Sequence, residues 1–219
     1  MNLLKDNVYK LYFKYFFPTM CAALSTSIYI LFDTIFIGQG VGSLGLTALN
    51  IALPIYSIYF GTGLLIGIGG STLMSIEKGR EREDKAQKIF TLSFVFGLIL
   101  AIIYTIVGFV FLEEIAVILG ATKEVLPLVK EYMIVVVFGT IPFVMGSILA
   151  PFIRADKAPK KAMFAVIFSG VLNIILDYIF VFPLKMGMKG AAIATVFSYT
   201  ISFLILLTHL LSKNNTLKF

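Results

Sequence analysis

Residues 89–112 read IFTLSFVFGLILAIIYTIVGFVFL, a run of 24 positions without a charged side chain. A helix needs about 20 mainly apolar residues to cross the ~30 Å hydrocarbon core of a bilayer. Strands of a membrane barrel would alternate apolar and polar positions, and lipid does not tolerate unpaired backbone groups. This continuous run therefore predicts a transmembrane helix and an integral membrane protein.

Five further stretches have the same character, and they cover residues 15–37, 45–76, 132–153, 162–184 and 190–212. Of the 219 residues, 59% are hydrophobic and 14% are charged. About a quarter of the residues in soluble domains are charged, so this composition cannot cover a water-facing surface. We predict an all-α integral membrane protein in which residues 1–219 form one unit of six transmembrane helices.

Lysine and arginine are distributed unevenly about these spans. Fourteen of the 18 basic residues precede the first span, follow the second or fourth span, or close the chain. The other four lie on the opposite side: Lys123, Lys130, Lys185 and Lys189. The positive-inside rule then predicts a multi-pass protein of the plasma membrane with both termini in the cytoplasm. The net charge of +6 reflects this topology and contact with the lipid bilayer, and we expect no nucleic-acid partner.

The second span is longer than the membrane requires. Its 32 uncharged residues would form a helix of roughly 48 Å at 1.5 Å per residue, so it should tilt, bend near Pro54 or protrude into water. Pro18 and Pro142 also lie inside spans, where each removes a backbone donor and favours a kink. Small residues allow close helix approach, and the candidates in the second span are Gly61, Gly63, Gly67, Gly69 and Gly70.

Two charged residues interrupt the spans, and both are acids: Asp33 and Asp177. A charge near the membrane centre costs ~2.5–3.5 kcal/mol even on the mildest scale, so such residues usually face a polar interior and carry function. The spans contain no lysine or arginine to neutralise either acid. The structural alternative is that each acid pairs with a neighbouring polar group and only holds the bundle together.

The two acids lie at similar depths on the outer side. At 1.5 Å per helical residue, Asp33 is ~6 Å and Asp177 ~10 Å below the outer ends of their spans. Thr195 and Asn50 both lie about 8 Å deep on neighbouring spans. Asn173 precedes Asp177 by four positions and so shares its helix face. Oxygen-bearing side chains from several helices can therefore meet in the outer half of the bundle.

Carboxylates with amide and hydroxyl oxygens suit a hard monovalent cation or a proton. Two buried acids without a cation would repel each other, so they should take up a proton or a metal ion in one conformation and release it in another. We expect no enzyme, because the sequence offers no nucleophile with a suitable base. The single histidine, His209, lies near the cytoplasmic end of the sixth span and is expected to be an interfacial residue.

Several passages resemble the N-terminal lobe of multidrug and toxic compound extrusion (MATE) transporters. The first are SIYILFDTIFIGQGVGSLG at residues 27–45, LNIALPI at residues 49–55 and GGSTLMS at residues 69–75. Residues 153–199 follow the family's order with RADKAPKKAM, LNIILDYIFVFPL and GMKGAAIATVFSY. The resemblance implies one six-helix lobe of a twelve-helix transporter.

The resemblance also assigns roles to individual residues. Asp33 matches the acid of the family's first helix, Asn173 and Asp177 match its Asn-x-x-x-Asp pair, and Thr195 matches a hydroxyl of the same cation site. It implies export of organic cations or drugs by an antiporter that uses Na⁺ or H⁺ as the coupling ion, with no other cofactor. Asn50 is a further candidate contact, from its depth. Some of the phenylalanines could line an aromatic drug cavity, with candidates Phe60, Phe94, Phe138, Phe143 and Phe168.

The chain departs from the family pattern at three points. Many relatives have Asn where this chain has Ile30, and Gly where it has Lys157. The family has two lobes, so we expect a second six-helix lobe as partner, either a C-terminal half or another copy. Two alternatives stay open: a lipid-linked oligosaccharide flippase of the same superfamily, which usually has cationic residues in its cavity, and a non-transporting membrane interaction module.

Overall fold

The computed structural model describes residues 8–212 and 215–218, and within them it contains helices and no strands. Five helices are long and apolar enough to cross a membrane, and a sixth crossing is made by a bent pair of shorter helices. The helices in chain order are α1 (Val8–Gly40), α2 (Ser43–Gly79), α3 (Glu83–Val110), α4 (Leu112–Ile118), α5 (Leu126–Phe138), α6 (Thr140–Ala155), α7 (Pro159–Val181) and α8 (Gly187–Leu207).

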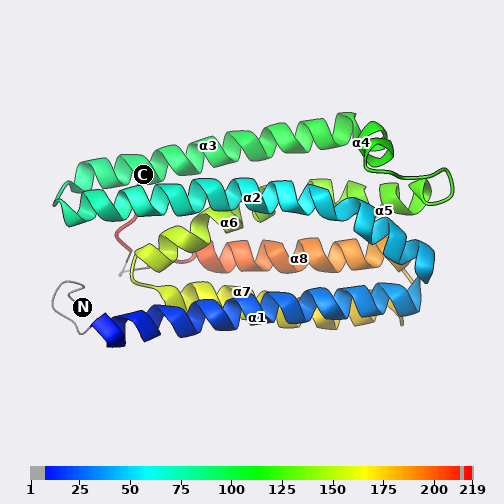
Figure 1. Cartoon of the computed structure of the whole chain (residues 1–219), viewed down its shortest axis with the longest axis horizontal. Helices are drawn as coiled ribbons and strands as arrows, with labels where there is room; N and C mark the ends of the chain where they lie inside the picture. Colours follow the sequence, from blue (N-terminus) through cyan, green and yellow to red (C-terminus); the bar gives the residue numbers. More distant parts are fainter. Residues whose placement is uncertain (1–7, 213–214, 219) are drawn as a thin grey trace.

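The crossings alternate in direction along one bundle (Figure 1). Helices α1, α3 and α7 run one way, while α2, the α5–α6 pair and α8 return. The loops at residues 80–82 and 156–158 therefore lie at one end, which we call the basic end because the basic residues that follow the second and fourth predicted spans gather there. The predicted all-helical membrane architecture is confirmed, with five single-helix crossings among the described residues and a sixth if the bent pair counts as one.

The fourth crossing is not the single helix predicted for residues 132–153. Helices α5 and α6 meet at an angle of 53° across Gly139. Pro142 explains the position of this break, since proline lacks the N–H that would bond to the carbonyl of Phe138, four residues earlier. Pro18 and Pro54, by contrast, lie inside helices that continue past them.

The predicted ends of other spans also shift. The fifth span was predicted to reach residue 184, but α7 ends at Val181, just before Pro183, which lacks the N–H needed to continue the helical hydrogen bonds. The sixth span was predicted to reach residue 212, but α8 ends at Leu207. The short helix α4, at the end opposite the basic end, was not predicted.

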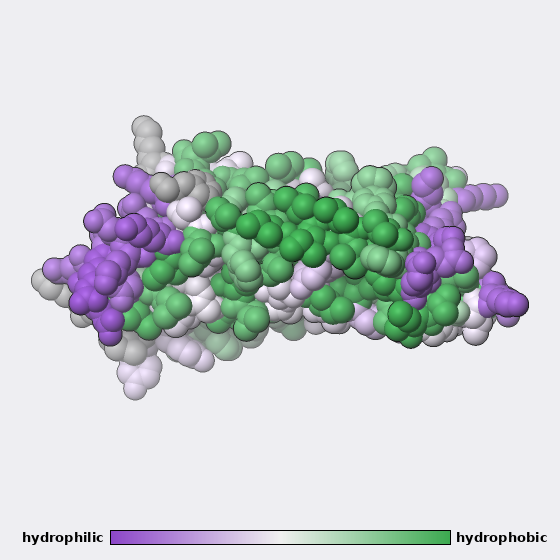
Figure 2. All heavy atoms as spheres, turned by 90° about the horizontal axis from the view of Figure 1, so that it is seen from above, coloured by the Kyte–Doolittle hydropathy of each residue, from purple (hydrophilic) through white to green (hydrophobic). Residues whose placement is uncertain are grey.

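Apolar side chains cover the outside of the bundle between its two ends. Figure 2 shows a broad hydrophobic band flanked by hydrophilic residues at both ends. Leu65 and Leu92 are 76% and 70% exposed within this region. Such a surface would aggregate in water, and it fits contact with hydrocarbon. Helix α6 contributes several of the fully buried side chains, including Ile148, Leu149 and Phe152.

Glycines in α2 allow α6 to approach closely. A Cβ added at Gly67 would lie 2.9 Å from backbone atoms of Ile148, and one at Gly63 would lie 2.5 Å from the Cβ of Ser147. Gly70 is packed in the same way, against Phe152 and Ser93. Gly61 and Gly69 instead have nothing within 4 Å of such a Cβ. The predicted role in packing therefore holds for three of the five glycines.

A buried polar cluster around Asp156 joins four segments at the basic end. Its carboxylate accepts a hydrogen bond from the backbone N–H of Thr216 at 3.0 Å and forms an ion pair with Lys78 at 3.2 Å. His209 Nε2 lies 2.8 Å from the carboxylate, and the Thr216 hydroxyl donates to it as well. His209 is only 2% exposed. The expectation that His209 is an interfacial residue is therefore wrong: it is part of an interior contact.

The cluster changes the ionisation of Asp156. Burial by itself would raise the pKa of this carboxyl group, but the hydrogen bonds from Thr216 and His209 and the charge of Lys78 hold the pKa below its usual value. The next residue, Lys157, has φ of 65°. This left-handed conformation costs a non-glycine residue roughly 1–2 kcal/mol, so glycine would suit the position better.

We predict that Gly67→Ala destabilises the bundle whereas Gly69→Ala does not. At position 67 the added methyl group would meet the backbone of α6, which cannot move aside without separating the helices. At position 69 it would meet open space, and alanine is favoured over glycine in a helix by roughly 0.5–1 kcal/mol. Melting temperatures of the purified variants in one detergent test this expectation. Equal melting temperatures would contradict the packing described for α2 and α6.

We also predict that Asp156→Asn lowers stability at neutral pH by about 1–3 kcal/mol, as expected for loss of charge-assisted hydrogen bonds in a buried cluster. Because folding lowers the pKa of Asp156, its contribution is fully present above the unfolded value of about 3.9 and is lost as the pH falls through the folded value. The difference between wild type and variant should therefore shrink below about pH 4. Unfolding measured from pH 3 to 8 tests this, with Glu124→Gln, on an exposed loop, as the control.

Candidate cation site

Helices α1 and α7 run in the same direction and approach each other at two small residues. A Cβ at Gly170 would lie 2.9 Å from the Ser25 hydroxyl, and one at Gly40 would collide with Cγ1 of Val181. Residues 25–40 of α1 thus lie beside residues 170–181 of α7. These two contacts bring Asp33 to the level of Asp177.

The two acids meet across this helix pair. Their charges interact with each other, although no hydrogen bond joins the two carboxyl groups. Asp177 is fully buried, whereas Asp33 is half-buried and lines a cavity. The acids therefore have different surroundings: Asp33 reaches open space, and Asp177 lies behind it among α1, α7 and α8.

Helix α8 completes the polar group. The side-chain amide of Asn173 on α7 donates to the hydroxyl of Thr195 at 3.4 Å. Thr195 also lines the cavity with Asp33. Ser198, one turn further along α8, is 2% exposed. Sequence analysis did not select Ser198, although its spacing of three residues from Thr195 places both on one helix face.

Several oxygen atoms in this group have no hydrogen-bond donor among the described residues. They are Oδ1 of Asp33, Oδ1 of Asn173, both carboxylate oxygens of Asp177 and the hydroxyl of Ser198. A buried polar atom without a partner costs about 1–3 kcal/mol, and more if it is charged. An isolated cluster of acceptors is therefore suited to a positively charged guest, either a proton or a cation with a preference for oxygen ligands.

Within the described ranges, there is no group of three or more His, Cys, Asp and Glu side chains that could hold a metal ion. The group around Asp177 instead combines two carboxylates with an amide and a hydroxyl.

Asn50 occupies a different position from the other candidates. It lines the same cavity from α2, but its side-chain amide donates to the carbonyl of Leu46 in its own helix at 2.8 Å. Ile30 also lines this cavity, so an asparagine at that position would add a polar group to the wall. The structure thus brings Asp33, Asn173, Asp177 and Thr195 together and leaves Asn50 on the facing wall.

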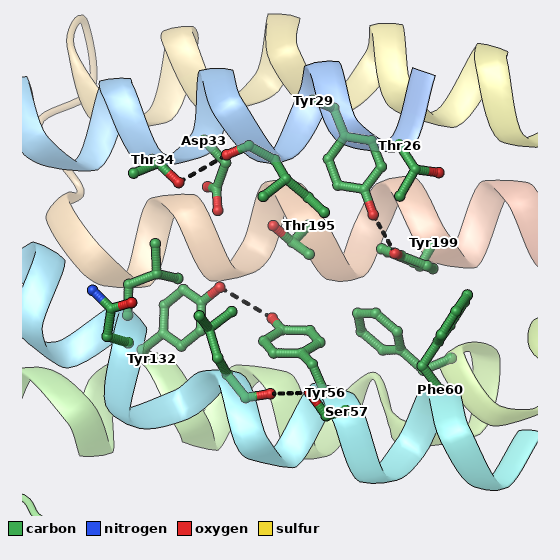
Figure 3. A pocket seen from close by; sticks show the side chains of 15 residues that line it. Thr26, Tyr29, Asp33, Thr34, Tyr56, Ser57, Phe60, Tyr132, Thr195 and Tyr199 are labelled. Atoms are coloured by element: carbon green, nitrogen blue, oxygen red, sulfur yellow. Dashed lines mark hydrogen bonds between the residues drawn. The ribbon is translucent and has the colours of Figure 1, made fainter. Parts of the chain in front are cut away.

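Tyrosines form much of the wall around Asp33. We call this space the Asp33 cavity; it has a volume of about 300 Å³. The hydroxyl of Tyr56 donates to that of Tyr132 at 3.1 Å, and the hydroxyls of Tyr29 and Tyr199 share a second hydrogen bond. Figure 3 shows both pairs with Asp33 and Thr195 around one space.

Sequence reasoning missed these tyrosines, although two of them carry a detectable signal. Tyr29 precedes Asp33 by four positions, and Tyr199 follows Thr195 by four, so each shares a helix face with a candidate site residue. Of the candidate phenylalanines, Phe60 and Phe143 line the Asp33 cavity. The rings of Phe143 and Tyr199 have centroids 4.0 Å apart.

A second space lies between the Asp33 cavity and the basic end. We call it the Arg154 cavity; it has a volume of about 330 Å³. Both spaces are lined by Thr26, Tyr29, Phe60 and Tyr199. The hydrogen-bonded pair of Tyr29 and Tyr199 therefore lies on the boundary between the two cavities.

The sequence matches the MatE family model over residues 18–179. A multidrug export protein, MepA, from Staphylococcus saprophyticus is 34% identical over 212 residues, which cover 96% of this chain and 47% of that protein. The chain belongs to the MatE family, whose members are transporters and not enzymes. It spans about half the length of the curated relatives it matches.

Solved structures agree with this assignment. A crystal structure of MATE in the straight conformation matches with a TM-score of 0.85 and 26% identity, over 92% of this chain and 45% of that one. A crystal structure of MATE in complex with MaD3S matches with a TM-score of 0.84 and 27% identity, over 91% of this chain and 45% of that one. The fold is that of half of a MATE transporter, a multi-pass membrane protein.

We predict that cysteines at positions 33 and 177 can be joined by a short thiol cross-linker. The test uses Asp33→Cys with Asp177→Cys in a Cys21→Ser background, so that no other thiol competes. The control pair is Ile35→Cys with Asp177→Cys. Position 35 is about 200° further around α1, and its side chain is 38% exposed. Mass spectrometry follows the rate of cross-linking for each pair. Equal rates for the two pairs would contradict the geometry described here.

Proposed function

We propose that this chain is the N-terminal lobe of a multidrug exporter of the MATE type, driven by Na⁺ or H⁺. In this proposal Asp33 and Asp177 bind the coupling ion or proton, and Asn173 and Thr195 complete its surroundings. The observation that supports it most is the set of buried oxygen atoms without donors in this group. A cation or a proton would remove that cost, and its release would restore it.

The proposal links ion binding to the shape of the lobe through α1. Asp33 on α1 and Asp177 on α7 repel each other when both are charged. A bound cation or proton would cancel this repulsion and favour close contact of α1 with α7. Loss of that guest would favour separation of the two helices, which changes the cavity that α1 lines. Binding at the acids thus provides a differential free energy between two conformations, as coupling requires.

The exported substrate in this proposal is an organic cation or drug. The Asp33 cavity combines a carboxylate with aromatic rings, including Tyr56, Tyr199 and Phe143. Aromatic faces attract cations electrostatically, and apolar walls accept the rest of a drug-sized molecule. Substrate and coupling ion would then compete for one negative region, which is a simple basis for exchange.

Alternating access by rocking of two lobes needs a partner, so we propose a second six-helix lobe, either a C-terminal half or another copy. Such lobes would be parallel repeats, because an even number of crossings returns the chain to the side on which it began. We place the protein in the plasma membrane with the basic end in the cytoplasm, as the positive-inside rule favours.

Cation binding by the purified chain in lipid nanodiscs tests the proposal. We expect saturable binding of radioactive ²²Na⁺ at alkaline pH, proton uptake on acidification, or both. Asp33→Asn and Asp177→Asn should each weaken the binding by about tenfold or more, since each removes a charge-assisted ligand. Asp84→Asn removes an exposed carboxylate at the basic end and should leave both measurements unchanged.

Two results would overturn the assignment. One is unchanged cation and proton binding in both site variants. The other is equal loss in Asp84→Asn, which would mean that binding follows the total acidic charge of the surface. If the acids had only a structural role, the wild type would show no saturable binding. The site variants would then differ from it only in a lower melting temperature.

A further inference from the structure

The Arg154 cavity is apolar along its length and basic at one end. It runs from the pair of Tyr29 and Tyr199 toward the basic end of the bundle. More than half of its lining residues are apolar, among them Ala22, Phe60, Leu64, Ala150, Val166 and Leu206. Arg154, in the last turn of α6, is the one charged residue among the described residues that line this cavity.

Arg154 has no counter-ion among the described residues. Other basic residues in the same region have one: Lys78 pairs with Asp156, and Arg80 and Arg82 pair with Glu77. Arg154 is half-buried, and no ion pair or side-chain hydrogen bond to a described residue satisfies its guanidinium group. A cation removed from water without a partner is costly, and an anion that entered the cavity would relieve that cost.

The polar lining offers few other donors. The hydroxyl groups of Thr19, Ser147 and Ser169 each donate to a carbonyl of their own helix. Ser202 on α8 is a further hydroxyl-bearing residue in the lining. A small hydrated anion would therefore find one guanidinium group and otherwise an apolar wall. A molecule with one anionic end and one apolar end matches this lining much better.

We propose that the Arg154 cavity binds an anionic phospholipid or lysophospholipid, with the phosphate group on Arg154 and one acyl chain along the apolar wall toward Tyr29. Guanidinium groups bind phosphate oxygens through paired, charge-assisted hydrogen bonds. Basic pockets between transmembrane helices on the cytoplasmic side are suited to anionic headgroups. The position of Arg154 at the basic end places the phosphate at headgroup level under the topology proposed above.

This site is distinct from the cation site in place and in charge. The Asp33 cavity has a carboxylate next to a second buried acid, and the Arg154 cavity has an unpaired guanidinium group. The contact of Tyr29 with Tyr199 lies between them. An anionic amphiphile is therefore attracted to the Arg154 cavity and repelled from the Asp33 cavity. An acyl chain bound in the Arg154 cavity would pack beside the tyrosine pair.

Equilibrium binding of tritiated oleoyl-lysophosphatidylglycerol to the purified chain, in micelles of an uncharged maltoside, tests this proposal. Wild type should bind it saturably, and Arg154→Gln should weaken the affinity by about tenfold or more. Lys160→Gln is the matched control, since Lys160 is an exposed cation near the same end. It should change the affinity by less than about twofold.

A second variant separates a cavity from a basic surface. Ala150→Phe fills the apolar part of the cavity and leaves Arg154 in place, so it should also abolish saturable binding. Normal binding in this variant would overturn the proposal, as would equal affinities of wild type and Arg154→Gln. Displacement of the lysolipid by millimolar inorganic phosphate would show that the site binds a soluble anion. It would overturn the proposal of an amphiphilic ligand. Melting temperatures near that of wild type establish that each variant is folded.

Discussion

The contact between α1 and α7 holds two carboxyl groups together in the apolar interior of the bundle, and the other polar features of the lobe are arranged around it. The helices approach closely because Gly170 and Gly40 present no side chain to their neighbours. That approach leaves Asp177 fully buried and Asp33 at a cavity wall. Buried acids of this kind are stable only with a positive guest or a proton, so the packing of two helices creates the requirement for one.

The Asp156 cluster and the group around Asp177 differ in how many hydrogen-bonding partners their buried polar atoms have. The Asp156 cluster is complete: each oxygen of its carboxylate has donors, and an ion pair balances its charge. The group around Asp177 has acceptors without donors. A complete network fixes one arrangement of helices, whereas an incomplete one responds to what binds. The Asp156 cluster therefore holds its segments in one arrangement, whereas the group around Asp177 has oxygen atoms available to a bound guest.

The two cavities share a boundary and differ in charge. Tyr29 and Tyr199 lie where they meet, and each tyrosine also shares a helix face with a candidate ion ligand. A rotation of α1 that moved Asp33 would move Tyr29 by the same angle, because both belong to one rigid helix. In the proposed function, a movement of Asp33 with α1 would therefore also shift one side of the boundary between the cavities.

The sequence by itself determined the six apolar crossings, the end at which basic residues gather, the similar depth of Asp33, Asp177 and Thr195, and the helix face that Asn173 shares with Asp177. These follow from counting residues, since a helix rises by a fixed 1.5 Å per position. Only the tertiary structure decided that Asp33 faces a cavity while Asp177 lies behind it, that His209 is buried against Asp156, and that the fourth crossing breaks at Gly139. The physical reason is that spacing along a chain fixes depth in the membrane, whereas the rotation of each helix and the choice of its neighbours depend on how all of the side chains pack.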